Sequence, residues 1–274
     1  MKQGGRLLTI YALVYFVFLY APALLLPIFA LNDSKVISFP LTGFTTSWFT
    51  GLFTDPKLAT LKASLWTSLQ VALTTSILAT TLGIFAARAA SKYRFRGKGA
   101  AISFIMLPLV LPEVVIGASL LVVLVVWLQV PLGTFAVILG HVLICTPFAI
   151  AILQGAFASL DQSLEEAAYD LGETPVSAFW RVILPLVMPG IISSLLITFI
   201  ISLDEFMIAY FLASNNPTLP VYLWGMLRFP DRVPYVMALG TLLVLLSIFL
   251  LTIAEYFRRR GIAKSGGKDT GGFL

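Results

Sequence analysis

The chain has 274 residues, of which 59% are hydrophobic and 11% are charged, and its mean hydropathy is +0.96. Soluble domains carry about 25% charged residues, so this composition excludes a soluble globular protein and indicates an integral membrane protein. The net charge of +5 is explained more simply by basic residues that flank membrane spans than by nucleic-acid binding.

Six apolar segments are long enough to cross a bilayer, which takes about 20 helical residues. We expect these spans near residues 7–31, 61–87, 100–128, 135–153, 190–212 and 233–257. The first is longer than the apolar part of a signal peptide and precedes no small-residue cleavage site, so we expect it to be retained. The sequence therefore predicts an all-α polytopic membrane protein with one transmembrane domain, residues 1–260. A disordered Gly/Lys-rich tail, residues 261–274, is expected to follow.

The Lys and Arg residues predict the orientation of these spans. Most of them, including Arg88 and Lys92, fall at one set of span ends. The positive-inside rule places that set in the cytoplasm, and six spans then leave both termini there. The loop between the fourth and fifth spans is expected on the same side.

That loop, residues 161–185, has the pattern of two short helices joined by a turn. Its local signals are a capping box from Ser163 to Glu166, a left-handed cap at Gly172, a helix start at Thr174-Pro175 and a helix end at Pro185.

The loop is also acidic, although the other loops expected on this side are basic. Its acidic residues are Asp161, Glu165, Glu166, Asp170 and Glu173, against one basic residue, Arg181. Each predicted helix carries an apolar stripe at helical spacing. A negative hairpin with apolar stripes suits docking into a groove of a soluble partner; the alternative is a solvated loop whose charge has no role.

The hairpin resembles a known family. Glu166-Ala167-Ala168, Gly172 and Ile183-Leu184-Pro185 are similar to the EAA loop of inner-membrane permeases of bacterial binding-protein-dependent ABC importers, with Val182 at a position where that pattern has isoleucine. The resemblance extends over the whole chain and implies the MetI-like permease fold in the bacterial cytoplasmic (inner) membrane. It also implies that the hairpin inserts into an ATPase subunit. The coupling residues would be Glu165, Glu166, Ala167, Ala168, Gly172 and Pro185.

The same resemblance implies which subunits form the complex and what each of them does. The partners would be a second homologous permease, two copies of an ABC ATPase and an extracytoplasmic substrate-binding protein. The chain has no phosphate-binding GxxxxGK[ST] loop, so we expect the ATPase to bind ATP and Mg, and this chain to be a transport subunit without enzyme activity or cofactor. One histidine, His141, and one cysteine, Cys145, make a metal site unexpected.

Several ionisable residues lie inside the predicted spans. Asp204 and Glu205 are adjacent in the fifth span, and Glu113 follows Pro112 in the third. A charge near the bilayer centre costs roughly 2.5–3.5 kcal/mol on insertion scales. These carboxylates either attract a cation in the translocation path or form structural pairs. Pro108 and Pro112 predict a broken helix, and His141 is expected to be a hydrogen-bonded interior residue, with a proton relay as the alternative.

The stretch SLDEFMIAYFL, followed by Thr218-Leu219-Pro220-Val221-Tyr222 and Leu227-Arg228-Phe229, is similar to the second permease of spermidine/putrescine importers. The resemblance implies inward transport of a polyamine by alternating access. Carboxylates and aromatic rings suit a polycation. The candidate path residues are Asp204, Glu205, Glu113, Tyr210 and Trp224. The alternatives are a permease for an opine, an aminophosphonate or a similar solute, and an ATP-independent secondary transporter or channel subunit.

Overall fold

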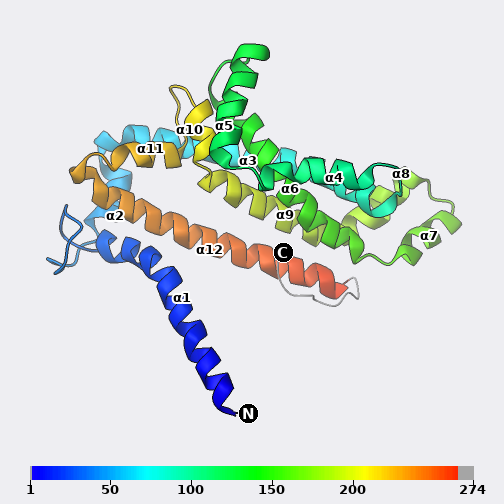
Figure 1. Ribbon diagram of the computed structural model, residues 1–274, viewed down its shortest axis with the longest axis horizontal. Helices are drawn as coiled ribbons and strands as arrows, with labels where there is room; N and C mark the ends of the chain where they lie inside the picture. The colour runs from blue at the N-terminus through cyan, green and yellow to red at the C-terminus, as the bar shows by residue number, and fades with distance from the viewer. Residues whose placement is uncertain (1, 265–274) are drawn as a thin grey trace. The chain divides into compact units, whose positions relative to one another are not determined.

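The computed structural model describes residues 2–264, and the regular elements of these residues are helices (Figure 1). They form two compact units. The N-terminal unit comprises residues 2–60 and 223–246, and the central unit comprises residues 61–222 and 247–264.

In the N-terminal unit, the loop after the first helix is held by one asparagine. The elements of this unit are α1 (Lys2–Ala30), α2 (Ser47–Thr54), η1 (Pro56–Leu58), η5 (Pro230–Arg232), the end of α11 (Leu219–Met226) and the start of α12 (Val233–Lys264). The buried Asn32 accepts the Thr42 amide on its Oδ1 atom at 2.9 Å, and its carbonyl accepts the Trp48 indole N–H at 2.9 Å. Trp48 in turn packs edge-on against Tyr235, with ring centroids 5.3 Å apart.

The central unit contains the predicted hairpin and the candidate path residues Glu113, Asp204, Glu205 and Tyr210. Its elements are α3 (Ala59–Lys92), α4 (Lys98–Met106), η2 (Leu107–Leu109), α5 (Glu113–Val122), the π-helical η3 (Val123–Trp127), α6 (Thr134–Ala158), α7 (Gln162–Asp170), α8 (Pro175–Ala178), the π-helical η4 (Phe179–Ile183), α9 (Leu184–Asp204) and α10 (Met207–Leu212).

Small residues allow close helix packing in this unit. Helices α6 and α9 lie side by side (Figure 1). A Cβ atom added at Gly190 would lie 2.5 Å from the Ala156 Cβ, and one added at Gly83 would lie 2.8 Å from the Ala149 Cβ. Glycine and alanine at helix crossings let backbones approach closely, which is how membrane helices gain packing energy. Helix α6 is therefore in tight contact with both α3 and α9.

The predicted spans are largely present as helices. Within residues 2–264, five helices are long and apolar enough to cross a membrane, and Lys98–Leu109 with Glu113–Trp127 adds a sixth span if that bent pair counts as one. The pair is bent by 100°, which confirms the break expected from the prolines, because proline removes a helical hydrogen bond. Helix α12 runs to Lys264, four residues into the range expected as a tail. Residues 265–274 of that range lie outside the described residues.

The fifth span differs from the expected continuous helix, residues 190–212, at both ends. It starts earlier, because the second arm of the hairpin continues directly into it and the apolar helix runs over Pro175–Asp204. The helix end expected at Pro185 is therefore wrong. Proline lacks an N–H, but the π-helical segment just before it shifts the hydrogen-bond pattern and lets the helix pass. The helix then ends at Asp204, and Glu205 is extended, with φ −67° and ψ 126°.

Candidate functional site

The first arm of the hairpin, α7, is capped by Asp161 and not by the predicted Ser163. The Asp161 side chain accepts the Ser163 amide at 2.9 Å, so the capping box expected from Ser163 to Glu166 is wrong. Aspartate is as good an N-cap as serine, and here the helix begins at Gln162, which puts Ser163 inside the first turn. The hydrogen bond from the Ser163 amide lowers the pKa of Asp161.

The turn of the hairpin has the expected geometry. Gly172 adopts a φ of +89°, which confirms the left-handed cap predicted there. Its amide donates to the Tyr169 carbonyl at 2.9 Å, and the Glu173 amide donates to the Ala168 carbonyl at 3.0 Å, as in a Schellman cap. The second arm starts as predicted, with Thr174 Oγ1 accepting the Ser177 amide at 3.3 Å.

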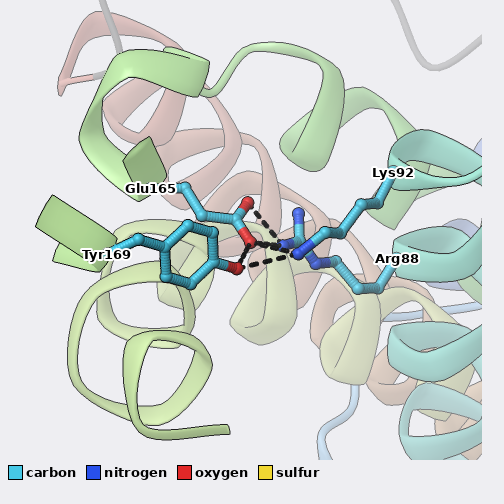
Figure 2. Close-up of polar contacts among 4 residues, drawn as sticks. All are labelled: Arg88, Lys92, Glu165 and Tyr169. Atoms are coloured by element: carbon cyan, nitrogen blue, oxygen red, sulfur yellow. Dashed lines mark hydrogen bonds and ion pairs between the residues drawn. The ribbon is translucent and has the colours of Figure 1, made fainter. Parts of the chain in front are cut away.

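Two basic residues of α3 meet two residues of α7 at the base of the hairpin (Figure 2). Arg88 Nη2 donates to both carboxylate oxygens of Glu165 at 2.6 Å. Lys92 Nζ donates to Glu165 Oε1 at 2.5 Å and to the Tyr169 hydroxyl oxygen at 2.9 Å. The Tyr169 hydroxyl itself donates to Glu165 Oε1 at 2.5 Å. These four residues, here called the Glu165 cluster, join the hairpin to α3.

The Glu165 cluster is well shielded from solvent. The Glu165 side chain is only 14% exposed and that of Arg88 17% exposed. Partial burial acts to raise the pKa of Glu165, but the hydrogen bonds from Arg88, Lys92 and Tyr169 outweigh it and lower the pKa to about 2. Glu165 is therefore ionised at any physiological pH.

A cavity of about 340 Å³ adjoins the cluster. Arg88, Lys92, Glu165 and Tyr169 line it together with Ser91 and Phe157. The Arg88 guanidinium also lies over the Phe157 ring, 5.9 Å from its centroid. The end of α6 thus supports the same cluster by a cation–π contact.

The predicted coupling residues divide between an exposed and an inward face of the hairpin. Glu166, Ala167, Gly172 and Pro185 are exposed, whereas Ala168 is buried and Glu165 faces α3. The apolar stripes divide in the same way. Ile183 is buried, but Leu164, Leu171, Val176 and Trp180 are exposed, Leu171 to 87%. The outer face of the hairpin therefore presents an acidic and apolar surface.

The two adjacent carboxylates of the fifth span have different surroundings. Glu205 is buried, and its Oε2 atom lies 2.9 Å from His141 Nε2, within ion-pair distance. Its carboxylate also accepts the amides of Ile208 at 2.7 Å and Ala209 at 3.0 Å, which are free at the start of α10. His141 Nδ1 lies 2.8 Å from the Ser202 hydroxyl, so His141 is the hydrogen-bonded interior residue that we expected.

The other candidate path residues are exposed on this chain. Asp204 interacts with the Ser247 side chain. Tyr210 packs against Phe206 with ring centroids 5.5 Å apart, and Glu113 is the first residue of α5. Trp224 is exposed too, but it belongs to the N-terminal unit.

The partners of Glu165 and His141 were not predicted from the sequence. Arg88 and Lys92 are four residues apart directly after the predicted span 61–87, and Glu165 and Tyr169 are four residues apart on the first predicted helix of the hairpin. That spacing places each pair on a single helix face, which is a signal that was available. Nothing in the sequence indicated that Ser202 would meet His141.

Comparisons with known proteins agree with the architecture. The family model described as "Binding-protein-dependent transport system inner membrane component" matches residues 79–262. The chain is 34% identical over 268 residues to the putrescine transport system permease protein PotI of Escherichia coli K12, covering 92% of this chain and 93% of that protein. It is 30% identical over 260 residues to the spermidine/putrescine transport system permease protein PotC of the same strain, covering 94% of each. A chain of a bacterial alginate ABC transporter, solved with its periplasmic protein, superposes with a TM-score of 0.67 at 17% identity over 94% of each chain, which shows a shared fold.

Proposed function

Because the chain belongs to the family of inner-membrane components of binding-protein-dependent transport systems, we propose that it is the permease subunit of an ATP-driven polyamine importer. The chain is a multi-pass membrane protein whose relatives PotI and PotC are permeases for putrescine and for spermidine/putrescine. The similarity to both covers at least 92% of the chain, and the family model over residues 79–262 includes the hairpin.

The observation that carries the proposal is the exposed outer face of the hairpin. Glu166 and Leu171 are exposed, while Glu165 and Ile183 hold the hairpin in place from the inner side. An acidic, apolar helical hairpin is a suitable ligand for a groove on a soluble protein. That protein would be an ABC ATPase, which would bind ATP and Mg, so this chain would need no cofactor of its own.

The proposed complex contains this chain, a second homologous permease, two ATPase copies and an extracytoplasmic substrate-binding protein. The hairpin and both termini lie in the cytoplasm. Arg88 and Lys92, which the positive-inside rule assigns to the cytoplasm, are in contact with the hairpin and so support this orientation. ATP binding would close the ATPase pair, move the hairpins and open the permease pair outward, and hydrolysis would reset it.

For the translocation path we propose Asp204, with Tyr210 following it on α10. Asp204 is exposed on this chain and carries a carboxyl group, whereas the neighbouring Glu205 uses its carboxylate inside the fold. A carboxylate and an aromatic ring can bind an ammonium group by ion pairing and cation–π contact. We assign Glu205 a structural role. Glu113 and Trp224 remain predictions for the path.

Cross-linking and uptake together test this function. Single cysteines at Leu171 or Val176, both exposed, can be linked to cysteines placed in the groove of the ATPase, because the native Cys145 is buried. We expect cross-links to the ATPase and, in proteoliposomes with the complete system, ATP-dependent putrescine and spermidine uptake. Normal uptake without any cross-link would refute the hairpin assignment. ATP-dependent uptake of an opine or aminophosphonate, but not of polyamines, would refute the substrate.

A further inference from the structure

Glu165 and Glu166 are neighbours in the hairpin, but their environments differ. Glu166 is exposed, whereas Glu165 is turned toward α3 and its side chain is 14% exposed. Arg88, Lys92 and Tyr169 already donate to its carboxylate. A shielded carboxylate with three donors has little capacity left for an ATPase. Its role must therefore be sought within this chain.

The hairpin is connected to the membrane helices in three ways. Chain continuity joins α7 to α6 through residues 159–161, and joins the second arm to α9 without interruption. An apolar cluster that includes Ala87, Phe157 and Ile183 packs the second arm against α3 and α6. The hydrogen bonds and ion pairs between α7 and α3, in contrast, run through Glu165 and Tyr169.

Helix α7 has nine residues, and local contacts stabilise both of its ends. Its turn at Gly172 and its cap at Asp161 fix its ends locally, but neither fixes its position against α3. The Glu165 cluster supplies that position with charge-assisted hydrogen bonds, which are about twice as strong as neutral ones.

We propose that Glu165 is a positioning residue of the transport cycle, which fastens α7 to α3 so that α3 moves together with the hairpin. The proposal rests on the proposed docking of the hairpin to an ATPase. Glu166, Leu171 and the outer face then receive the force, and the Glu165 cluster passes it to α3, a helix that neither arm of the hairpin reaches by chain continuity. Without the cluster, the ATPase would still bind and hydrolyse ATP, but less of the movement of the hairpin would be transmitted to α3.

The test uses the complete complex with its binding protein in nanodiscs and in proteoliposomes. We compare wild type, E165Q and the exchanged pair E165R/R88E, and measure binding-protein-stimulated ATP hydrolysis, polyamine uptake and the amount of ATPase that co-purifies. We expect E165Q to retain the ATPase and its hydrolysis, while uptake per ATP falls about tenfold, as loss of a coupling interaction predicts. The exchanged pair should recover most of that ratio, because it restores opposite charges across the same gap.

A matched control is Glu255, near the end of α12. Its carboxylate accepts three hydrogen bonds, from Arg258 at 2.7 and 2.8 Å and from Arg259 at 2.6 Å, whereas Glu165 accepts four. Those partners lie on the same helix, and their loss would free no helix from another. We therefore expect E255Q to keep the wild-type ratio of uptake to hydrolysis.

Three outcomes would decide against the proposal. Loss of the ATPase from E165Q complexes would make Glu165 a docking residue, and an unchanged ratio of uptake to hydrolysis would remove its role in coupling. An equal loss in E255Q would show that any broken ion pair disturbs the cycle. If no ATPase co-purifies with the wild-type chain, the proposed function itself fails, which is a separate and recognisable result.

Discussion

His141 Nε2 lies 2.9 Å from Glu205 Oε2, and this pair joins α6 to the break between α9 and α10. Both side chains are buried, at most 3% exposed. The same carboxylate accepts the first free amides of α10. The presence of Glu205 in a membrane span is thus explained by the backbone amides of α10 that it stabilises. Its neighbour Asp204 is left available for transport.

Replacement of Glu205 should destabilise the protein. E205A would leave two buried amides without their acceptor and His141 without its neighbour, and each buried polar group left unsatisfied costs about 1–3 kcal/mol. We expect a clearly lower thermal unfolding temperature of the purified complex in detergent. E205Q keeps acceptor capacity through its amide oxygen and should lose less. A wild-type unfolding temperature for E205A would contradict this account of the helix break.

Replacement of Asp204 should impair transport rather than assembly. A charge-assisted hydrogen bond contributes about 1.5–3 kcal/mol, so D204N should lower polyamine uptake by roughly tenfold or more. Assembly of the complex, measured by co-purification of the second permease, should be retained. The control S247A removes the polar partner of Asp204 but keeps its charge, and we expect it to transport well. Equal loss of assembly and uptake in D204N would make this carboxylate structural.

At the turn of the hairpin, a substitution of Gly172 should be tolerated if the new residue readily adopts the left-handed backbone conformation. A Cβ atom at Gly172 would meet nothing within 4 Å, so any cost arises from its φ of +89°. A left-handed conformation costs an L-residue roughly 1–2 kcal/mol, whereas asparagine adopts it more readily. We expect G172V to reduce both ATPase co-purification and uptake, and G172N to remain close to wild type. If both variants fail alike, then the size of the side chain at the tip matters, and not the backbone.

The tether between α7 and α3 should be insensitive to pH in the physiological range. The pKa of Glu165 is lowered from 4.5 to about 2 in the folded protein. A depressed pKa stabilises the folded state above the unfolded value, and this contribution is lost as the pH falls from about 4.5 toward 2. Hydrogen exchange of α7, corrected for intrinsic rates, should therefore be constant from about pH 7 to 5 and increase only below that range. Faster exchange between these two values in the wild type would show that another group controls the tether.

The sequence predicted the features that depend on local chemistry. Gly172 and Pro175 determine a turn and a helix start through backbone conformations that few residues share. Pro108 and Pro112 indicated the bend of the third span, because a missing N–H acts wherever the residue is placed. These signals need only the nearest neighbours along the chain.

Features that depend on tertiary contacts were not predictable in the same way. At the break after Asp204, Glu205 contacts His141 on another helix, and no local pattern identifies that partner. Pro185 was expected to end a helix, but a π-helical segment and the packing of Ile183 carry the helix past it. Asp161 replaced Ser163 as the cap because two suitable residues competed within one turn.

The continuous helix Pro175–Asp204 has 30 residues, which corresponds to a length of ~45 Å at 1.5 Å per residue. One end is the arm of the hairpin that we assign to the ATPase, and the other end is the carboxylate that we assign to the cargo. Contact with the ATPase and contact with the substrate would thus occur at opposite ends of a single helix. A small tilt of this helix at its cytoplasmic end would displace Asp204 directly, without movement of other elements between them. A substitution that makes the middle of the helix more flexible would delay the movement of Asp204 relative to that of the hairpin.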